Sequence, residues 1–396
     1  MGKVPALKWW PRAWLALALV FTLGPAKREP PRAPAAPVTG CEATGTKLPV
    51  GTVVGPSTLA TVDFVSASTG VALTAPSVTC PEKYGGSRSA AFPVRLVGTA
   101  DAGHTWRVEG TAPPLAGPGP PYVQLAFATS RLGWADFGYG LSFTANGGRT
   151  WQRVDLGGKL VADLAYTGGK AVVVTWEDWQ VWGAGRDDHW HLLRPPPAQR
   201  GSLEGASVAL GPRAGDLVIV TNRGSWPHQR STLAETTDGG EHWAVGRNPC
   251  APPKWLGAGP LAQSPGGELG VICGGLGGAG STAHGLYVSD DRGRHWSARA
   301  IDDLVHSGAA YFPAQDSPEA FAMPTADRFY VATENFFSES TDGGRAWRPA
   351  ADQAYGPGNL VAGTQGPTID FVSARDGWAL WDGLKRTTTG VVWAKA

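Results

Sequence analysis

Carboxylate and imidazole side chains are the groups in this 396-residue chain that could carry out acid–base or metal chemistry. Hydrolysis of a glycosidic bond needs two carboxylates on either side of a cleft, about 5–10 Å apart. The candidates for such a pair are Glu177, Asp178, Glu334 and Glu339. The sequence does not place any two of them opposite one another. We therefore expect no catalytic residue and a protein that is not an enzyme, with a glycosidase as the alternative.

The histidines and the remaining acidic residues show no metal-ligand spacing. His104, His189, His242 and His295 each stand one or two residues before a tryptophan, and no His-Glu-x-x-His or Cys/His pattern is present. The acidic pairs 187–188, 290–291 and 302–303 are typical of turns and loops, where weak calcium binding is the alternative. Residues 275–280 match Gly-x-Gly-x-x-Gly, but a strand-like segment follows instead of the helix that a dinucleotide site needs. We expect no metal and no cofactor.

A recurrent eight-residue pattern, Ser/Thr-x-Asp-x-Gly-x-x-Trp, orders the whole chain. Four copies are complete, at residues 99–106, 236–243, 289–296 and 340–347, and the copy at 144–151 has Asn in place of Asp. The acidic or amide residue and the tryptophan of each copy are Asp101 and Trp106, Asn146 and Trp151, Asp238 and Trp243, Asp291 and Trp296, and Asp342 and Trp347. We call each copy an anchoring turn.

The pattern suits a tight turn between antiparallel strands. The Asp or Asn side chain accepts backbone N–H bonds across the turn, and glycine adopts the positive φ that such a turn requires. The Ser or Thr hydroxyl closes the turn from the incoming strand, while the tryptophan begins the outgoing strand and covers apolar surface. The repeated carboxylates are therefore predicted to be structural.

Two weaker copies extend the series to seven. Trp190 keeps only the tryptophan and an acidic turn, and Trp393 ends a copy with one residue deleted. The seven tryptophans then recur every 39 to 53 residues. Units of this length are typical of a radial or solenoid repeat array.

The repeating unit contains four short strands. Residues 61–73, 123–135 and 368–380 each read as an apolar strand, a turn that ends in glycine and a second apolar strand. A third strand leads into the anchoring turn and a fourth follows it. The sequence therefore predicts an all-β fold, a seven-bladed β-propeller with four-stranded antiparallel blades. We expect residues 50–54 to pair with the short outer strand of the last blade and close the ring.

The composition agrees with an all-β chain and limits the classes of partner that the protein is expected to bind. Charged residues make up 17% of the sequence, and 55 glycines and 33 prolines provide many turns. The net charge is +1, which favours neither nucleic acid nor an anionic membrane surface as partner.

The N-terminus is typical of an exported protein. Basic residues precede an apolar run of 11 residues, from Ala13 to Leu23, and small residues follow at Gly24 and Ala26. We predict a signal peptide at 1–26, a Pro/Ala-rich linker at 27–45 and the propeller at 46–396. An uncleaved signal anchor or a lipidated Cys41 would be the only connection to a membrane.

Four cysteines in an exported chain indicate two disulfides. Cys250 and Cys273 lie in the same repeat and are the natural pair, which leaves Cys41 with Cys80. The alternative is that Cys273 is a small buried apolar residue.

The anchoring turns resemble the Asp-box, or bacterial neuraminidase repeat, of sialidases, sortilin, xyloglucan-cleaving glucanases and photosystem II stability and assembly factors. The Asp-Phe-Val-Ser segments at 63–66 and 370–373, together with the Thr-Asp-Gly-Gly-x-x-Trp turns, are most similar to the last family. That resemblance implies a seven-bladed exported propeller that helps to assemble a protein complex, with the turns away from the binding face. The Arg-Ile-Pro segment typical of sialidases is absent.

Aromatic residues outside the turns suggest where a partner binds. Tyr139, Trp179 and Phe336 lie in segments with more aromatic side chains than one strand pair can bury. We expect these three to contribute to a shared face for a protein partner, with carbohydrate as the alternative ligand and packing between blades as the structural alternative. The function predicted from the sequence is a non-catalytic scaffold for binding and assembly.

Overall fold

The computed structural model divides the chain into two units, Met1–Val38 and Thr39–Ala396, and the residues that it describes all belong to the second. The structure describes residues 42–44, 48–56, 59–74, 77–79, 95–111, 124–136, 140–167, 169–176, 180–185, 189–193, 203–211, 213, 215–224, 230–250, 255, 257–278, 281–302, 318–333, 336–350, 367–381 and 383–396. The predicted signal peptide and most of the linker lie outside these ranges.

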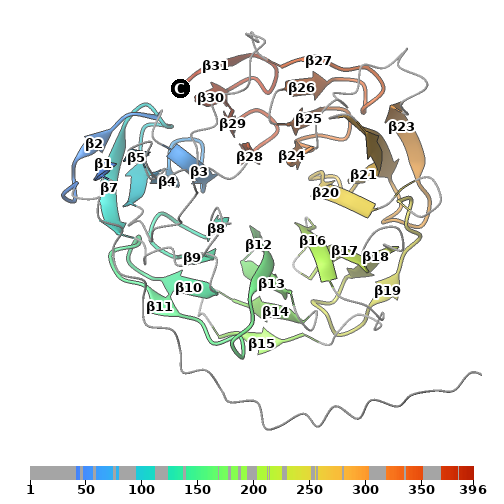
Figure 1. The fold of residues 1–396 in the computed structure, drawn as a ribbon, viewed down its shortest axis with the longest axis horizontal. Helices are drawn as coiled ribbons and strands as arrows, with labels where there is room; N and C mark the ends of the chain where they lie inside the picture. Colours follow the sequence, from blue (N-terminus) through green and yellow to red (C-terminus); the bar gives the residue numbers. More distant parts are fainter. Residues whose placement is uncertain are drawn as a thin grey trace, which may run out of the picture. The chain divides into compact units, whose positions relative to one another are not determined.

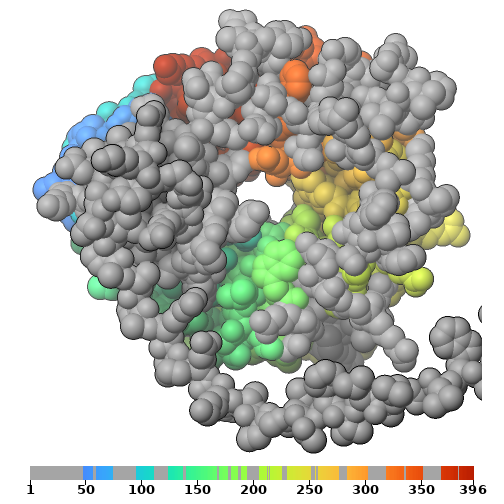
Figure 2. All heavy atoms as spheres, in the orientation of Figure 1, coloured from blue at the N-terminus to red at the C-terminus, as the bar shows by residue number. Residues whose placement is uncertain are grey.

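The second unit is a seven-bladed β-propeller whose blades are antiparallel sheets arranged around a central axis (Figure 1). In every blade the first strand is innermost, and the next three follow outward in sequence order. The fold class predicted from the sequence is confirmed. In the space-filling view the ring is open at its centre (Figure 2).

The strands of the seven blades follow one another without interruption along the chain. Blade 1 contains β3 (Leu59–Phe64), β4 (Gly70–Thr74), β6 (Arg95–Thr99) and β7 (Trp106–Thr111). Blade 2 contains β8 (Gln124–Phe127), β9 (Gly133–Asp136), β10 (Leu141–Thr144) and β11 (Gln152–Arg153). Blade 3 contains β12 (Val161–Thr167), β13 (Lys170–Thr175), β14 (Val181–Ala184) and β15 (His191–Leu192). Blade 4 contains β16 (Leu203–Leu210), β17 (Leu217–Arg223), β18 (Arg230–Thr236) and β19 (Ala244–Val245).

The remaining three blades complete the ring. Blade 5 contains β20 (Gly257–Gln263), β21 (Leu269–Gly278), β22 (Ser281–Ser289) and β23 (Ser297–Asp302). Blade 6 contains β24 (Ala320–Ala322), β25 (Phe329–Ala332), β26 (Phe337–Ser340) and β27 (Arg348–Pro349). Blade 7 contains β28 (Thr368–Phe371), β29 (Gly377–Leu380), β30 (Leu384–Thr387) and β31 (Trp393–Lys395). The Gly-rich segment at 275–278 extends β21, and β22 follows it, so it begins no helix.

The position of a strand within its blade determines its burial. The second strands are buried on both faces, because each blade packs between two neighbours. Every residue of β4, β9 and β25 is buried. Their sequences are continuous apolar runs, as expected for strands covered on both faces. The fourth strands β11, β15, β19 and β27 are two residues long and exposed. Short edges of this kind limit strand pairing between molecules.

The segment predicted to close the ring has a different partner. β2 (Val53–Val54) pairs with β7, placing Val54 opposite Trp106, and adds a fifth strand to blade 1. The prediction that residues 50–54 pair with the last blade is therefore wrong. β31 supplies the fourth strand of blade 7 from the same segment of chain as the other three. A separate two-stranded sheet joins β1 (Glu42–Thr44) to β5 (Ser77–Thr79).

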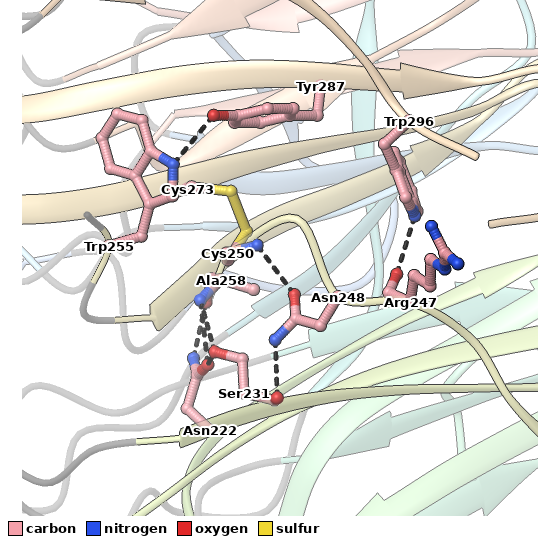
Figure 3. The surroundings of a disulfide bond; sticks show 10 residues. All are labelled: Asn222, Ser231, Arg247, Asn248, Cys250, Trp255, Ala258, Cys273, Tyr287 and Trp296. Atoms are coloured by element: carbon pink, nitrogen blue, oxygen red, sulfur yellow. Dashed lines mark hydrogen bonds between the residues drawn. A yellow bond between two sulfur atoms is a disulfide. The ribbon is translucent and has the colours of Figure 1, made fainter. Parts of the chain in front are cut away.

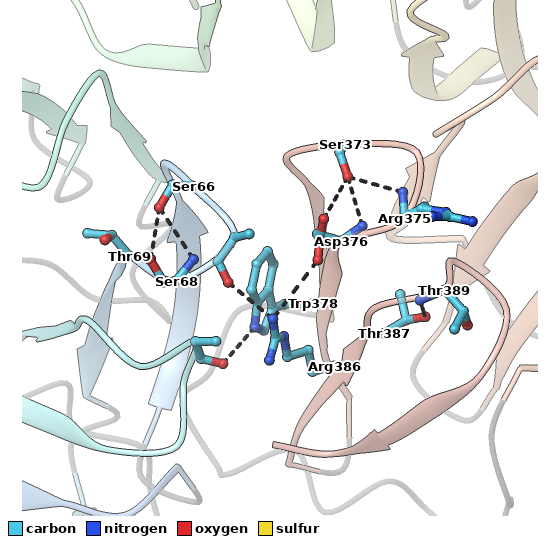
Figure 4. A network of polar contacts seen from close by, with 12 residues as sticks. Ser66, Ser68, Thr69, Ser373, Arg375, Asp376, Trp378, Arg386, Thr387 and Thr389 are labelled. Atoms are coloured by element: carbon cyan, nitrogen blue, oxygen red, sulfur yellow. Dashed lines mark hydrogen bonds and ion pairs between the residues drawn. The ribbon is translucent and has the colours of Figure 1, made fainter.

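Among the described residues, side chains and not a shared strand join the last blade to the first (Figure 4). The indole of Trp378 lies parallel to the Phe64 ring, with 3.6 Å between ring centroids, and its Nε1 donates to the carbonyl of Ala102 at 3.0 Å. Arg386 lies over the Trp378 ring and donates to the carbonyl of Ala67. The interface between blades 7 and 1 is thus a filled aromatic contact with hydrogen bonds at its margin.

Candidate functional site

The anchoring turns have the hydrogen bonds that their sequence predicts. In the turn of blade 1, the Thr99 hydroxyl donates to Asp101 at 2.8 Å and accepts from the Gly103 amide at 3.0 Å, while Asp101 accepts from the Thr105 amide at 2.8 Å. The same three bonds recur in the turns of blades 2, 4, 5 and 6. The acceptors Asp101, Asn146, Asp238, Asp291 and Asp342 are therefore occupied by their own turns.

Two successive residues of each of these five turns have positive φ. The glycine that the pattern specifies does so in every copy, as Gly344 shows with φ of 87°, and the residue before it does so too. That preceding residue is glycine in three turns but Ala102 and Arg292 in the other two. The turn therefore depends on two adjacent residues in the positive-φ conformation, and this shared backbone geometry explains why the five turns have the same length.

Hydrogen bonding keeps the turn carboxylates ionised. The amide of His242 is the largest influence on Asp238 and lowers the pKa of that carboxyl, and His295 does the same for Asp291. Slight burial opposes ionisation of Asp101, but bonds from Thr105 and Thr99 outweigh it and lower its pKa to about 2. The imidazole Nδ1 of His242 lies 2.8 Å from Asp238, a contact that the spacing of the pattern does not indicate.

The two weak copies of the turn, in blades 7 and 3, lack the carboxylate or the hydroxyl of the complete copies. In blade 7 the Thr389 hydroxyl replaces the carboxylate and accepts from the amides of Val391 and Val392. In blade 3 the third strand ends at Ala184, which has no hydroxyl, whereas the third strands of the other blades end at Ser or Thr, the first position of the turn. Residues 186–188 lie outside the described part of the chain. Blade 3 is the blade in which the pattern is most eroded.

The innermost strands carry polar side chains that bond to the next blade. Asp370 accepts from the Phe64 amide at 2.5 Å, Asp63 from the Phe127 amide at 2.5 Å and Asp163 from the Val208 amide at 2.6 Å. Gln124 and Ser207 make the corresponding bonds at two other interfaces. These side chains connect neighbouring blades close to the central axis.

The three inner carboxylates have raised pKa values. Burial is the main cause for each, and it raises the pKa of Asp163 to about 7 and that of Asp370 to about 6. The pKa of Asp63 is raised well above its usual value by burial and then by the negative charge of Asp370. Each carboxylate is half-buried and accepts a backbone N–H from the next blade.

A cavity of 330 Å³ lies where the innermost strands of blades 3 to 7 end. Tyr166, Phe321 and Phe371 line it, together with Met323 and Ser373. Each aromatic ring also packs on a core ring: Tyr166 on Trp134, Phe321 on Phe329, and Phe371 on Tyr330. We call this cavity the channel mouth.

The channel mouth is at the same end of the propeller as the anchoring turns, whereas the family resemblance implies a binding face away from them. Strands alternate in direction within a blade, so the connections after the first and third strands leave from one end and those after the second strand from the other. We call these ends the turn face and the opposite face.

The aromatic residues predicted to bind a partner follow second strands, which end at the opposite face. Tyr139 and Trp179 lie outside the described residues. Phe336 is half-buried, and its amide donates to the Thr333 hydroxyl at 2.9 Å. A shared face made by these three residues stays a prediction.

The cysteine prediction is confirmed for one pair. A disulfide joins Cys250, which follows blade 4, to Cys273 on β21 of blade 5 (Figure 3). Asn248 accepts from the Cys250 amide and donates to the carbonyl of Ser231, which ties the same segment to blade 4. Cys41 and Cys80 lie outside the described residues.

Other candidate groups have structural environments. Glu339 is buried and pairs with Arg348, whose Nε is 2.7 Å from its carboxylate, while Glu177, Asp178 and Glu334 lie outside the described ranges. The four histidines before tryptophans are exposed. In the part of the chain that the structure describes, no three His, Cys, Asp or Glu side chains gather as metal ligands would. That same part contains no helix with the length and hydropathy to span a bilayer.

Comparisons with known proteins support the fold. A structure described as YCF48 bound to D1 peptide has a TM-score of 0.50 and 19% identity, covering 90% of this chain and 99% of that one. YCF48 from Cyanidioschyzon merolae also has a TM-score of 0.50, with 15% identity over 88% and 98% of the two chains. An ancestral GH74 enzyme has a TM-score of 0.52 and 13% identity, covering 76% of this chain and 44% of that one.

Sequence comparisons add no family to this result. No family model matches the chain, and no curated protein matches it. Because the structural matches are below 25% identity, what they share with this chain is the propeller architecture.

Proposed function

We propose that this protein is an exported, non-catalytic propeller that binds an extended segment of a protein partner and acts as an assembly scaffold, similar to photosystem II stability and assembly factors. The observation that carries this proposal is the convergence of Tyr166, Phe321 and Phe371 on the channel mouth. Rigid aromatic side chains that are already packed on one side lose little freedom when they bind, and such residues dominate protein interfaces.

The size and chemistry of the channel mouth suit part of a peptide. Its volume of 330 Å³ is large enough for one or two apolar side chains, and Met323 provides an adaptable contact at its wall. YCF48, which has the same architecture, is described in complex with a D1 peptide, and this favours a peptide ligand over a small metabolite. Export is proposed from the N-terminal sequence alone.

The proposal can be tested with a phage-displayed library of linear peptides selected on the immobilised protein. We expect selected peptides to bind Tyr166→Leu/Phe321→Leu/Phe371→Leu at least about tenfold more weakly than the unmodified protein, because the substitutions keep apolar volume but remove the rings.

A second triple variant separates the two ends of the propeller. Tyr139→Leu/Trp179→Leu/Phe336→Leu removes the aromatic residues predicted from the sequence and should leave the affinity within about twofold, provided that both variants keep the unfolding midpoint of the unmodified protein. Loss of binding only in this second variant would move the site to the opposite face. Failure to select any peptide would contradict the peptide-binding function.

A carbohydrate ligand is the second candidate, because the ancestral GH74 enzyme shares the propeller architecture and aromatic rings also bind sugars. The inner carboxylates Asp63, Asp163 and Asp370 are each bonded to a neighbouring blade, so we expect xyloglucan oligosaccharides to remain uncleaved. Release of reducing ends from such a substrate, lost in Asp370→Asn, would favour the glycosidase instead.

A further inference from the structure

A second cavity, of 310 Å³, lies between blades 3 and 4 on the turn face. Its floor is apolar and buried, with Val172, Leu193 and Leu217 each no more than 8% exposed. Glycine backbone forms much of its walls, including Gly183 and Gly239. Among the described lining residues, Leu210 is the one that the channel mouth and this cavity share, so we treat the two as separate sites.

Blade 3 has small side chains at the position where blade 7 has large ones, and the cavity lies beside them. Val172 on β13 pairs with Gly183, the residue just before the first position of the eroded turn. In blade 7 the corresponding pair is Trp378 and Arg386, which fill the interface with blade 1. Leu193, from the end of blade 3, contacts Gly240 but leaves the space above Val172 open.

Positively chargeable side chains surround the opening of this cavity. Lys170, His191 and Arg213 line it and are exposed. Lys170 crosses from blade 3 to blade 4, where its ammonium lies 2.5 Å from the position of a β-carbon built on Gly239. None of the three has an ion pair with another described residue.

The carboxylate among the described lining residues is already neutralised from the other side. Asp216 is 9% exposed, and its Oδ2 lies 3.5 Å from the guanidinium of Arg292 in blade 5. The opening therefore has an excess of positive charge above an apolar floor. An anionic group on an apolar body complements both parts.

We propose that the cavity between blades 3 and 4 is a binding site for small organic carboxylates with an apolar body. The apolar body occupies the space above Val172 and Leu217, and the carboxylate reaches the opening. Arg213 offers the planar fork that pairs with a carboxylate through two parallel hydrogen bonds, and Lys170 adds a second charge.

Isothermal titration calorimetry with 3-phenylpropanoate tests this assignment. The neutral amide of the same acid should bind at least about tenfold more weakly, because it lacks the charge that the opening complements. Lys170→Gln/Arg213→Gln should weaken binding of the carboxylate by a similar factor. Val172→Phe should abolish binding by occupying the floor.

A matched variant controls for the loss of two charges. Arg131→Gln/Arg149→Gln removes two exposed arginines from the same face of blade 2 and should leave the affinity within about twofold. Unchanged unfolding midpoints confirm that each variant is folded. No binding of 3-phenylpropanoate, equal affinity for the amide, or an equal loss in the matched variant would each overturn the proposal. Tighter binding of phenyl phosphate would overturn the assignment to carboxylates.

Discussion

The interface between blades 7 and 1 and the interface between blades 3 and 4 have the same strand order but are filled differently. Across the first, Trp378 stacks on Phe64, and Leu384 lies against Gly103 of the next turn. Across the second, Val172 stands in place of the tryptophan, and a cavity of 310 Å³ remains. The strands and turns form the ring in both cases. The side chains at this position are large at the first interface, where the space is filled, and small at the second, where a cavity remains.

The difference in packing also matches what else joins the blades at each interface. Among the described residues, blades 7 and 1 are joined by no shared strand and no disulfide, so their side chains must supply the closing contact. Blades 3 and 4 are consecutive in the chain, and Asp163 already bonds their inner strands. An interface between consecutive blades therefore tolerates a cavity that the closing interface would not.

Replacing the large side chain should expose this difference most clearly. Trp378→Ala should lower the free energy of unfolding by about 3–5 kcal/mol, because it leaves a cavity and removes the bond to the Ala102 carbonyl. Val172→Ala at the equivalent position should cost about 1.5 kcal/mol, since only two methyl groups are lost. Urea unfolding followed by tryptophan fluorescence measures both. Equal losses would contradict the comparison.

The interface between blades 4 and 5 provides a covalent third case. Cys250→Ser/Cys273→Ser opens a loop with a sequence separation of 23 residues. The loss of this constraint on the unfolded chain should cost about 3 kcal/mol. The unfolding midpoint of the oxidised protein, compared with that of the double variant, measures it. A midpoint that did not change would mean that the network around Asn248 holds this interface without the disulfide.

The anchoring turns could be predicted because every bond within them is local. A hydroxyl, a carboxylate, a glycine and a tryptophan act within eight residues, so residue type and spacing determine the geometry. The seven repeats of the pattern then predicted the number of blades. The same locality explains why the erosion of the turn in blade 3 is visible in the sequence itself, where Trp190 is kept but no Ser or Thr precedes it in residues 183–189.

Long-range pairing could not be predicted in the same way. β2 is two residues long, and its sequence does not indicate which blade's exposed edge strand it joins. Its pairing with β7 depends on the path of the chain before blade 1. The channel mouth is built by several blades, and no short segment contains more than a part of it. One indication was present: Asp63 and Asp370 occupy the same place in the matching segments 61–73 and 368–380, and both bond to the next blade.

Removing a hydroxyl should distinguish the complete turns from the eroded one. Thr99→Ala leaves the buried amide of Gly103 without its acceptor and should cost about 1–3 kcal/mol. Ala184→Ser in blade 3 adds the missing hydroxyl where no complete turn exists, and should change stability by less than about 0.5 kcal/mol. Urea unfolding of both variants at pH 7 measures the contrast. A clear gain from Ala184→Ser would show that the turn of blade 3 lacks only this one group.

The inner carboxylates should give the smallest effect, and its sign follows from their raised pKa. The pKa of Asp163 is about 7 in the folded protein, against about 4 in an unfolded chain. The folded state therefore binds the proton more tightly, so the contribution of Asp163 is most stabilising below about pH 4 and is lost as the pH rises through 7. Because the side chain is partly exposed, solvent screening should limit the change to about 1–2 kcal/mol. Asp163→Asn should make this decline between pH 4 and 8 smaller when urea unfolding is measured across the range, while Asp63 and Asp370, whose pKa values are also raised, keep the rest of it. Asp238→Asn, in an exposed turn, should leave the decline in place, since Asp238 has a lowered pKa and stays ionised throughout that range. A decline of unchanged size in Asp163→Asn would mean that the interface between blades 3 and 4 is insensitive to protonation of Asp163.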